Sequence, residues 1–379
     1  TNTYCYMMRK LLYSFLFFIL LCSVGFTQTT TWTGNNNTAW NVGGNWSNGV
    51  PGTTTAVIIP SASRYPIVSV STRCASITFT GNTGSVSVNS GITLTCDGAL
   101  AVNPSTNSSG NINILGAGIL STASVVIGLN PVDFTNSGTS VLTSTISNFN
   151  VSGNFTLNST RDSYWWFGTQ EVFNNARFYL EGGVLNIDGS IVTNNSNASN
   201  NTTFSTANGS TTRTLLLGNV TPFVLSGGTN NILLNGTNAT VNYDRVGGQS
   251  VYGTNYNNLI FSGGTGTKTL QGAIVGNGNV NNEMGVTLAT ENNSVTLNGN
   301  FTNAGTFAAG SSPVILGGTS NQSIAGFTTT GIVSMTKTGG TATFTENVNA
   351  GGLTINGSGG TLNLGSSLTH TFTGNWTRT

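Results

Sequence analysis

The chain has 379 residues, of which 6% are charged and 37% hydrophobic, and its formal net charge is +1. So little charge excludes electrostatic binding to nucleic acid or to acidic membranes as its main activity. Disordered chains lack β-branched and aromatic residues, whereas Val, Ile, Leu and Phe recur here at alternate positions. The composition therefore indicates a folded, glycine-rich chain with a nearly uncharged surface.

Residues 1–27 have the features of an export signal. Arg9 and Lys10 precede an apolar run, 11–24, which is long enough for a signal-peptide core and too short to span a bilayer. We therefore expect a secreted protein, extracellular or on a bacterial cell surface, with no membrane span in the mature chain.

Three tryptophans, Trp32, Trp40 and Trp46, follow within fifteen residues, and the strand 56–59 comes after them. This W…W…NWSxGxP…VxIP pattern resembles the N-terminal region of adhesin-like bacterial surface proteins, which are β-helix proteins exported by the type IX or autotransporter routes. The resemblance implies a parallel β-helix. The tryptophans either cap the open end of a stack of coils or present flat rings to carbohydrate.

From residue 74 onward, short segments alternate apolar residues with Ser, Thr or Asn, which is the period of a half-buried strand. Gly, Asn or Asp bound each segment, and no helical period is sustained after residue 30. Residues 194–209 are low in apolar residues, and we expect a protruding loop there. The expected strands are 76–79, 85–88, 92–95, 99–102, 111–114, 184–187, 214–217, 232–234, 258–261, 295–297, 353–355 and 362–364.

Two landmarks recur at nearly one spacing. The sequence Gly-Asn-Phe-Thr at 299–302 is matched by 374–377, 75 residues later, and by 153–156, 146 residues earlier; the similar segments around Gln249 and Gln322 are 73 residues apart. Such a repeat implies an elongated stack, with three or four coils of roughly 20 to 25 residues in each repeat. We therefore predict an all-β, right-handed parallel β-helix rather than a sandwich of antiparallel sheets.

The abundant Asn and Thr residues suit this fold. Asn tolerates the left-handed backbone found at corners, and stacked Asn or Thr side chains on successive coils can form hydrogen-bond ladders. Identical uncharged side chains can stack at strand spacing, whereas identical charges repel. We therefore expect such ladders here.

We divide the chain into the leader 1–27, an N-terminal cap region 28–73 and β-helix repeats 74–379. Because the repeat unit restarts at 374–377, we expect the chain to be truncated at its C-terminus.

Cys74 and Cys96 are the two cysteines that follow the leader, and their spacing of 22 residues is about one coil. On adjacent coils they lie within reach of a disulfide. The alternative is two buried, unpaired thiols.

The segment 161–181 interrupts the repeats with charged and aromatic residues. Sugar rings stack on flat apolar side chains while their hydroxyls bond charged groups, so this insertion is the candidate carbohydrate-binding site. The alternative is a lateral segment that packs its own aromatic side chains against the wall. The candidate site residues are Tyr164, Trp165, Trp166, Asp162, Glu171 and Arg177.

Glycan cleavage needs clustered carboxylates, and the ten acidic residues are scattered without a close doublet. The best set is Asp162, Glu171 and Glu181, with Arg161 or Arg177 as the cation. His370 is the only histidine and suggests no metal site, and we expect no cofactor.

We therefore expect a non-catalytic structural or adhesive stalk of a cell surface, with a polysaccharide or a host or neighbouring cell surface as partner and no nucleic acid. The alternative is the carbohydrate-binding β-helix module of a polysaccharide-degrading enzyme.

Overall fold

The computed structural model describes residues 28–103, 110–128, 138–165, 169–195 and 200–378, and for 160–165 and 169–174 it describes the backbone alone. The leader 1–27 and Trp166 lie outside the described residues. One short 3₁₀ turn, η1 (Gly43–Asn45), is the only helical element in the described part of the chain, and the rest is strand and turn.

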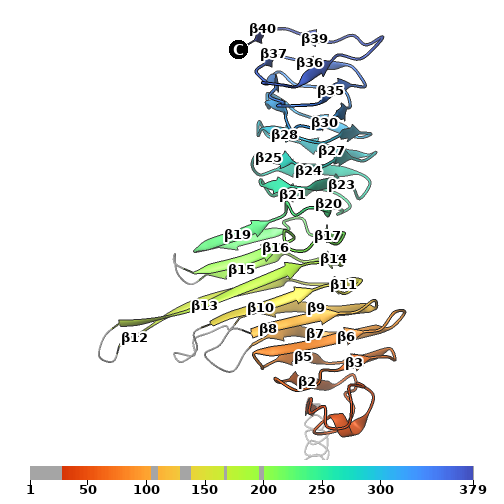
Figure 1. The fold of residues 1–379 in the computed structure, drawn as a ribbon, viewed down its shortest axis with the longest axis vertical. Helices are drawn as coiled ribbons and strands as arrows, with labels where there is room; N and C mark the ends of the chain where they lie inside the picture. The colour runs from red at the N-terminus through yellow and green to blue at the C-terminus, as the bar shows by residue number, and fades with distance from the viewer. Residues whose placement is uncertain (1–27, 104–109, 129–137, 166–168, 196–199, 379) are drawn as a thin grey trace, which may run out of the picture.

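The strands wind into a right-handed parallel β-helix with three walls, as predicted (Figure 1). Each coil visits wall 1, wall 2 and wall 3 in turn. Along wall 1 each strand pairs in parallel with its equivalents in the neighbouring coils. The sheets of walls 2 and 3 are interrupted after β18 (Phe223–Ser226) and β19 (Thr229–Leu233), where new sheets begin, and an isolated bridge between Leu234 and Tyr256 spans the break in wall 3. This pairing gives the backbone groups of the strands hydrogen-bond partners in the next coil, which is why a chain so rich in short strands forms one stack.

Wall 1 consists of the following strands, where β7 and β9 contribute their first halves: β4 (Thr72–Cys74), β7 (Thr93–Val102), β9 (Ile119–Ile127), β11 (Asn148–Val151), β14 (Gly183–Ile187), β17 (Arg213–Leu217), β20 (Ala239–Tyr243), β23 (Asn258–Phe261), β26 (Val280–Asn282), β29 (Phe301–Asn303), β32 (Gln322–Ile324), β35 (Thr341–Phe344) and β38 (Thr361–Asn363).

Wall 2 consists of the second halves of β7 and β9 together with β1 (Gln28–Thr31), β2 (Thr55–Ile59), β5 (Ser76–Phe79), β12 (Phe155–Trp165), β15 (Ile191–Asn195), β18 (Phe223–Ser226), β21 (Gln249–Val251), β24 (Gly266–Leu270), β27 (Val286–Ala289), β30 (Thr306–Ala308), β33 (Phe327–Thr328), β36 (Val348–Ala350) and β39 (Thr371–Phe372).

Wall 3 consists of β3 (Ile67–Val68), β6 (Thr83–Val88), β8 (Gly110–Leu115), β10 (Gly138–Ser144), β13 (Thr169–Leu180), β16 (Asn201–Ser205), β19 (Thr229–Leu233), β22 (Asn255–Tyr256), β25 (Ile274–Gly276), β28 (Val295–Leu297), β31 (Val314–Leu316), β34 (Ile332–Met335), β37 (Gly352–Ile355) and β40 (Trp376–Arg378).

The coils differ in length along the stack. In the C-terminal half, Val280 pairs with Phe301, 21 residues later, as the predicted coil length requires. In the middle, Phe149 pairs with Leu185, 36 residues later, so the predicted length is too short there. The difference arises because the long strands β12 and β13 belong to this coil.

The copies of each repeat landmark do not lie on the same wall. A repeat of three or four complete coils would have placed them on one wall, so this part of the prediction is wrong. Gln249 begins β21 in wall 2, whereas Gln322 begins β32 in wall 1, eleven strands later. The Gly-Asn-Phe/Trp-Thr copies likewise enter β12, β29 and β40, on three different walls. Each wall needs the same pattern, a Gly-Asn corner followed by a short alternating strand, so one motif serves at any corner.

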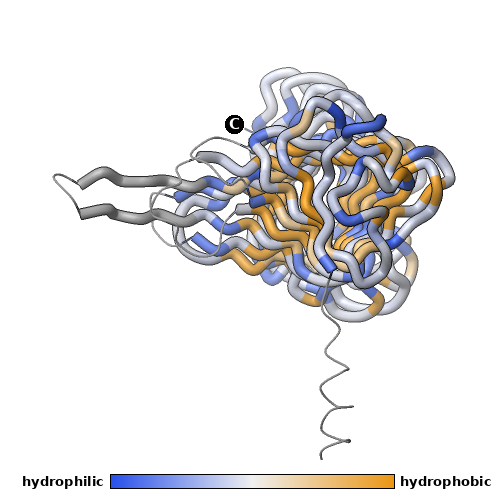
Figure 2. The backbone as a smooth tube through the Cα atoms, turned by 90° about the horizontal axis from the view of Figure 1, so that it is seen from below, coloured by the Kyte–Doolittle hydropathy of each residue, from blue (hydrophilic) through white to orange (hydrophobic). Residues whose placement is uncertain are grey.

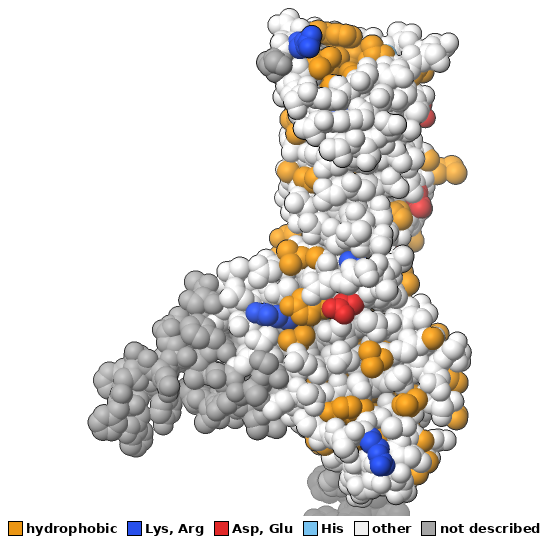
Figure 3. All heavy atoms as spheres, in the orientation of Figure 1, with side chains coloured by type: hydrophobic (Ala, Val, Ile, Leu, Met, Phe, Trp, Pro, Cys, Tyr) orange, Lys and Arg blue, Asp and Glu red, His pale blue; other side chains and the backbone are white. Residues whose placement is uncertain are grey.

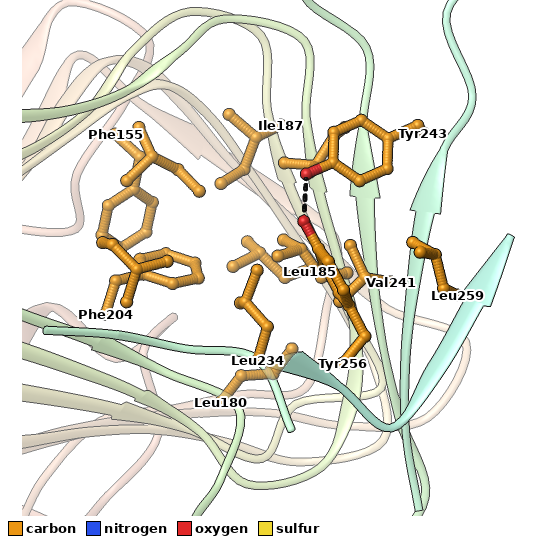
Figure 4. Packing of buried hydrophobic residues seen from close by; sticks show 14 of the residues in the cluster. Phe155, Leu180, Leu185, Ile187, Phe204, Leu234, Val241, Tyr243, Tyr256 and Leu259 are labelled. Carbon is orange, nitrogen blue, oxygen red and sulfur yellow. Dashed lines mark hydrogen bonds between the residues drawn. The ribbon is translucent and has the colours of Figure 1, made fainter. Parts of the chain in front are cut away.

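Hydrophobic positions recur along the stacked coils (Figure 2), and buried hydrophobic side chains form one continuous apolar core. Tyr243 and Tyr256 are fully buried within it, and their hydroxyl oxygens are 2.7 Å apart in a hydrogen bond (Figure 4). A buried tyrosine hydroxyl needs a hydrogen-bond partner. Each of these two hydroxyls supplies one for the other, so both can be buried in the apolar core.

The N-terminal tryptophans form the predicted cap. The rings of Trp32 and Trp40 each meet that of Trp46 edge to face, with centroids 4.9 and 4.8 Å apart. The Trp46 indole N–H donates to the carbonyl of Trp40 at 2.6 Å. All three side chains are at most 5% exposed, so their faces cover the end of the core and are not open to a sugar ring.

The expectation of a loop at 194–209 is wrong for part of that stretch. Residues 201–205 form β16, which pairs with β13 and β19. Phe204 packs against Phe155 and Phe178 in the core, and Thr202 donates to Asn230 at 2.9 Å. Within β16 the polar side chains of Thr202, Thr203 and Ser205 are therefore buried rather than in a loop. Residues 196–199 lie outside the described residues.

Candidate functional site

The predicted insertion contains an antiparallel hairpin. β12 and β13 leave their walls and pair with each other from Thr160–Asn174 to Trp165–Thr169, and this ribbon projects sideways from the stack (Figure 1). Asp162, Tyr164, Trp165 and Glu171 lie on the ribbon, where the backbone alone is described. Their role in carbohydrate binding therefore stays a prediction.

Arg177 is not on the projecting ribbon. It lies in the part of β13 that belongs to wall 3, between Val141 of β10 and Thr203 of β16. The structure therefore separates this predicted site residue from the other four described ones.

The acidic residues of the insertion are not cross-strand partners. Asp162 pairs with Val172, and Glu171 pairs with Ser163, whereas Glu181 follows β13 and bonds through its backbone N–H to Ser144. Among the described residues, no three His, Cys, Asp or Glu side chains come together in a group that could hold a metal ion.

His370 is a structural residue. Its Nδ1 accepts the backbone N–H of Val348 at 3.0 Å, its Nε2 lies 2.7 Å from the carbonyl of Leu364, and its ring packs between Phe344 and Phe372.

Two hollows lie on the outer face of wall 1. The first, of about 310 Å³, crosses β7, β9 and β11 and includes Asp97 and Asp188. Arg73 Nε donates to both carboxylate oxygens of Asp97, each at 2.7 Å. Arg73 Nη2 lies 2.7 Å from Asp97 Oδ1, and this is the only ion pair among the described side chains. The remaining polar residues that line it are Thr95, Ser121, Thr122, Asn150 and Ser152.

The second hollow, of about 360 Å³, crosses β20, β23, β26 and β29 and has no charged residue in its lining. This size is at the lower end of the range for ligand sites. Sequence reasoning missed it, although the regular 21-residue spacing of Asn258, Asn279 and Asn300 was a signal. The lining residues are Thr240, Asn258, Leu259, Ile260, Asn279, Asn281, Asn300 and Thr302.

The outer surface is otherwise nearly uniform. The face drawn in Figure 3 is mostly backbone and uncharged polar side chains, with scattered hydrophobic side chains and few charged ones. Asparagine side chains bond one another across coils, as expected from the composition: Asn282 and Asn298 donate from Nδ2 to Oδ1 of Asn303 and Asn277.

In a second asparagine ladder, which uses the backbone, the oxygens of Asn258 and Asn279 accept the backbone N–H of Asn279 and Asn300. A left-handed backbone occurs at Asn238 and Asn292, which each have φ 63°.

Three cations lie inside the stack, and none of them forms an ion pair with a carboxylate among the described side chains. Lys268 and Lys337 are 0% exposed and Arg213 is 1% exposed. Arg213 donates to the carbonyls of Thr206 and Thr211 at 2.5 and 2.6 Å. Burial lowers the pKa of each of the three groups, and it lowers that of Lys268 to about 8. Backbone carbonyls thus replace water around each charge.

Cys74 and Cys96 lie in register on adjacent coils, as predicted. Both side chains are buried and both thiols are free. The hydrogen bond with Cys96, together with burial, raises the pKa of the Cys74 thiol. The two thiols are therefore placed for a bridge, and the bridge itself stays a prediction.

No helix in the described part of the chain is long and apolar enough to cross a membrane. Comparison with models of known protein families, with curated proteins and with solved structures finds no match to this chain.

Proposed function

We propose that this protein is a secreted structural and adhesive stalk of a cell surface, without catalytic activity. The observation that carries the proposal is the unbroken series of coils. Wall 1 contains thirteen stacked strands, which at about 4.8 Å per strand give a rod on the order of 60 Å long. A rod of this kind suits the task of holding a recognition element away from a surface.

The hairpin of β12 and β13 is the recognition element in this proposal. Binding residues are commonly found on irregular segments that a rigid scaffold positions. The walls around the hairpin are chemically uniform, whereas the hairpin sequence holds Tyr164, Trp165 and Asp162 together. Polysaccharides or the surfaces of host or neighbouring cells are the expected partners, because aromatic and charged groups side by side suit sugar rings.

Labelling of intact source cells tests the location. Antibodies raised against residues 28–379 should label unpermeabilised cells in immunogold electron microscopy. A version that lacks residues 1–27 is the control and should be labelled only after permeabilisation. Label that appears only inside permeabilised cells with the full chain would remove the proposal.

The second candidate function, a carbohydrate-binding module, is favoured by a separate observation, the uncharged hollow on wall 1.

A further inference from the structure

We infer that the hollow over β20, β23, β26 and β29 binds a neutral, hydroxyl-rich polysaccharide that lies along the axis of the stack. This site is distinct from the hairpin, and the inference does not depend on where the protein is located. It follows from the way the asparagine ladder uses its hydrogen-bonding groups.

In this ladder the side-chain amide oxygen of each asparagine accepts a hydrogen bond from the backbone of the next coil. Asn258 Oδ1 accepts the backbone N–H of Asn279 at 3.0 Å, and Asn279 Oδ1 accepts that of Asn300 at 3.3 Å. Asn300 Oδ1 in turn accepts the backbone N–H of Ser323 at 2.9 Å. Since only an oxygen can accept these bonds, the amides have one possible orientation.

The amide nitrogens of the same side chains do not donate hydrogen bonds within the described part of the chain. Asn281 Oδ1 accepts the hydroxyl of Thr302 at 2.7 Å, so this side chain also uses its oxygen. No acceptor within the described part of the chain bonds the Nδ2 group of Asn258, Asn279, Asn281 or Asn300. The hollow therefore presents a row of N–H donors that repeats once per coil, about 4.8 Å apart.

The lining limits the chemistry of the ligand. It has no Lys or Arg, so an anionic polymer would lose water from its carboxylates or phosphates without a compensating cation. The half-buried Ile260 adds an apolar surface between the amides of the neighbouring coils. A neutral glycan supplies what this surface lacks, namely regularly spaced oxygen acceptors beside the flat apolar face of a ring.

The periodicity favours a polymer over a single sugar. Asn258, Asn279 and Asn300 occupy equivalent places on three successive coils. An extended glycan along the axis would meet the same donor at each step. Gly278 allows its coil to pass close to the side chain of Asn258, because a Cβ at residue 278 would lie only 2.5 Å from Asn258 Oδ1.

The test is affinity gel electrophoresis of the protein that begins at residue 28, in gels containing mixed-linkage β-glucan, galactomannan or polygalacturonate. The variant Asn281→Leu with Thr302→Val removes the outward polar groups of one in-register pair and leaves the backbone ladder intact. We expect the parent to be retarded by at least one neutral polysaccharide, and the double variant to bind it about tenfold more weakly, the loss of one to two net hydrogen bonds.

A matched control lies on wall 2. Thr328 and Asn349 are an in-register, hydrogen-bonded Thr-Asn pair on neighbouring coils there. Asn349→Leu with Thr328→Val should leave the retardation unchanged, and circular dichroism should show the same β-rich spectrum for all three proteins. A third variant, Trp165→Ala with Trp166→Ala, separates this site from the hairpin and should also bind as the parent does.

Three results would overturn the inference: no retardation of the parent by either neutral polysaccharide, retardation by polygalacturonate alone, or equal binding by the parent and the wall 1 variant. None of these results would bear on the location of the protein.

Discussion

Lys268 donates a hydrogen bond from Nζ to Oε1 of Gln249, 2.8 Å away, and the two residues are in-register neighbours on β24 and β21. Lys337 bonds Gln322 in the same way, at 2.7 Å. Each glutamine also donates from Nε2 to backbone carbonyls of the preceding coil, those of Asn219 and Gly299 among them. The glutamines recognised as a repeat in the sequence are thus the amide partners of two buried lysines.

The buried lysines lead to the first prediction. The chain beyond residue 27 contains no other lysine, and both are 0% exposed. An N-hydroxysuccinimide ester should therefore modify a folded protein of residues 28–379 at its N-terminal amine alone. After unfolding, peptide mass spectrometry should find both lysines modified. Rapid modification of either lysine under native conditions would contradict this placement.

The lowered pKa of Lys268 gives the second prediction. Its pKa is about 8 in the folded state and about 10.4 when unfolded, so the unfolded chain binds more protons between these values and stability rises with pH there. Relative to Lys268→Met, the parent should gain about 2 kcal/mol between pH 8 and pH 10.

Thermal unfolding in the presence of reductant measures this gain, and the comparison with the variant cancels the titration of the tyrosines. A difference between parent and variant that stays constant across the pH range would contradict a neutralised buried lysine.

The tryptophan cap provides the third prediction. Trp46 is 5% exposed and contacts two other indole rings, so Trp46→Ala should cost about 3–5 kcal/mol. Trp376, at the other end of the stack, is 58% exposed, and Trp376→Ala should change stability by less than about 1 kcal/mol. Thermal midpoints of the two variants check this, and equal midpoints would argue against a cap.

The fold was accessible from the sequence because a solenoid repeats one local rule. The expected strands 76–79, 258–261 and 295–297 match β5, β23 and β28, since alternating burial and bounding Gly or Asn residues are local properties. The wall on which a motif lies could not be predicted from the sequence. Gln249 and Gln322 occupy similar positions at the start of a strand, but the two strands belong to different walls.

The candidate sites were harder to find for a physical reason. The hollow on wall 1 is built from ordinary Asn and Thr residues, and its lining depends on the register of four coils. The same residue types serve as corners elsewhere in the stack. Aromatic and charged residues, by contrast, make the insertion at 161–181 conspicuous, although the sequence did not reveal that its last residues, with Arg177, belong to wall 3.

The hairpin provides the fourth prediction. Trp165→Ala with Trp166→Ala should weaken adhesion to host or neighbouring cell surfaces, because aromatic side chains supply much of the contact energy at sugar-binding faces. The circular dichroism spectrum should not change. Trp376→Ala is the control, since it removes an exposed tryptophan from a different part of the molecule. Adhesion that survives the double substitution intact would leave a purely structural stalk.

The central claim is a parallel stack in the stated register, and engineered cysteines test it directly. In a Cys74→Ala, Cys96→Ala background, Asn281→Cys and Thr302→Cys fall on in-register neighbours, whose spacing of about 4.8 Å suits a disulfide. Ile260→Cys with Thr302→Cys lies two coils apart. Non-reducing peptide mass spectrometry after mild oxidation should find a bridge in the first protein and free thiols in the second. Free thiols in the first protein, or bridges formed equally in both, would contradict the stack.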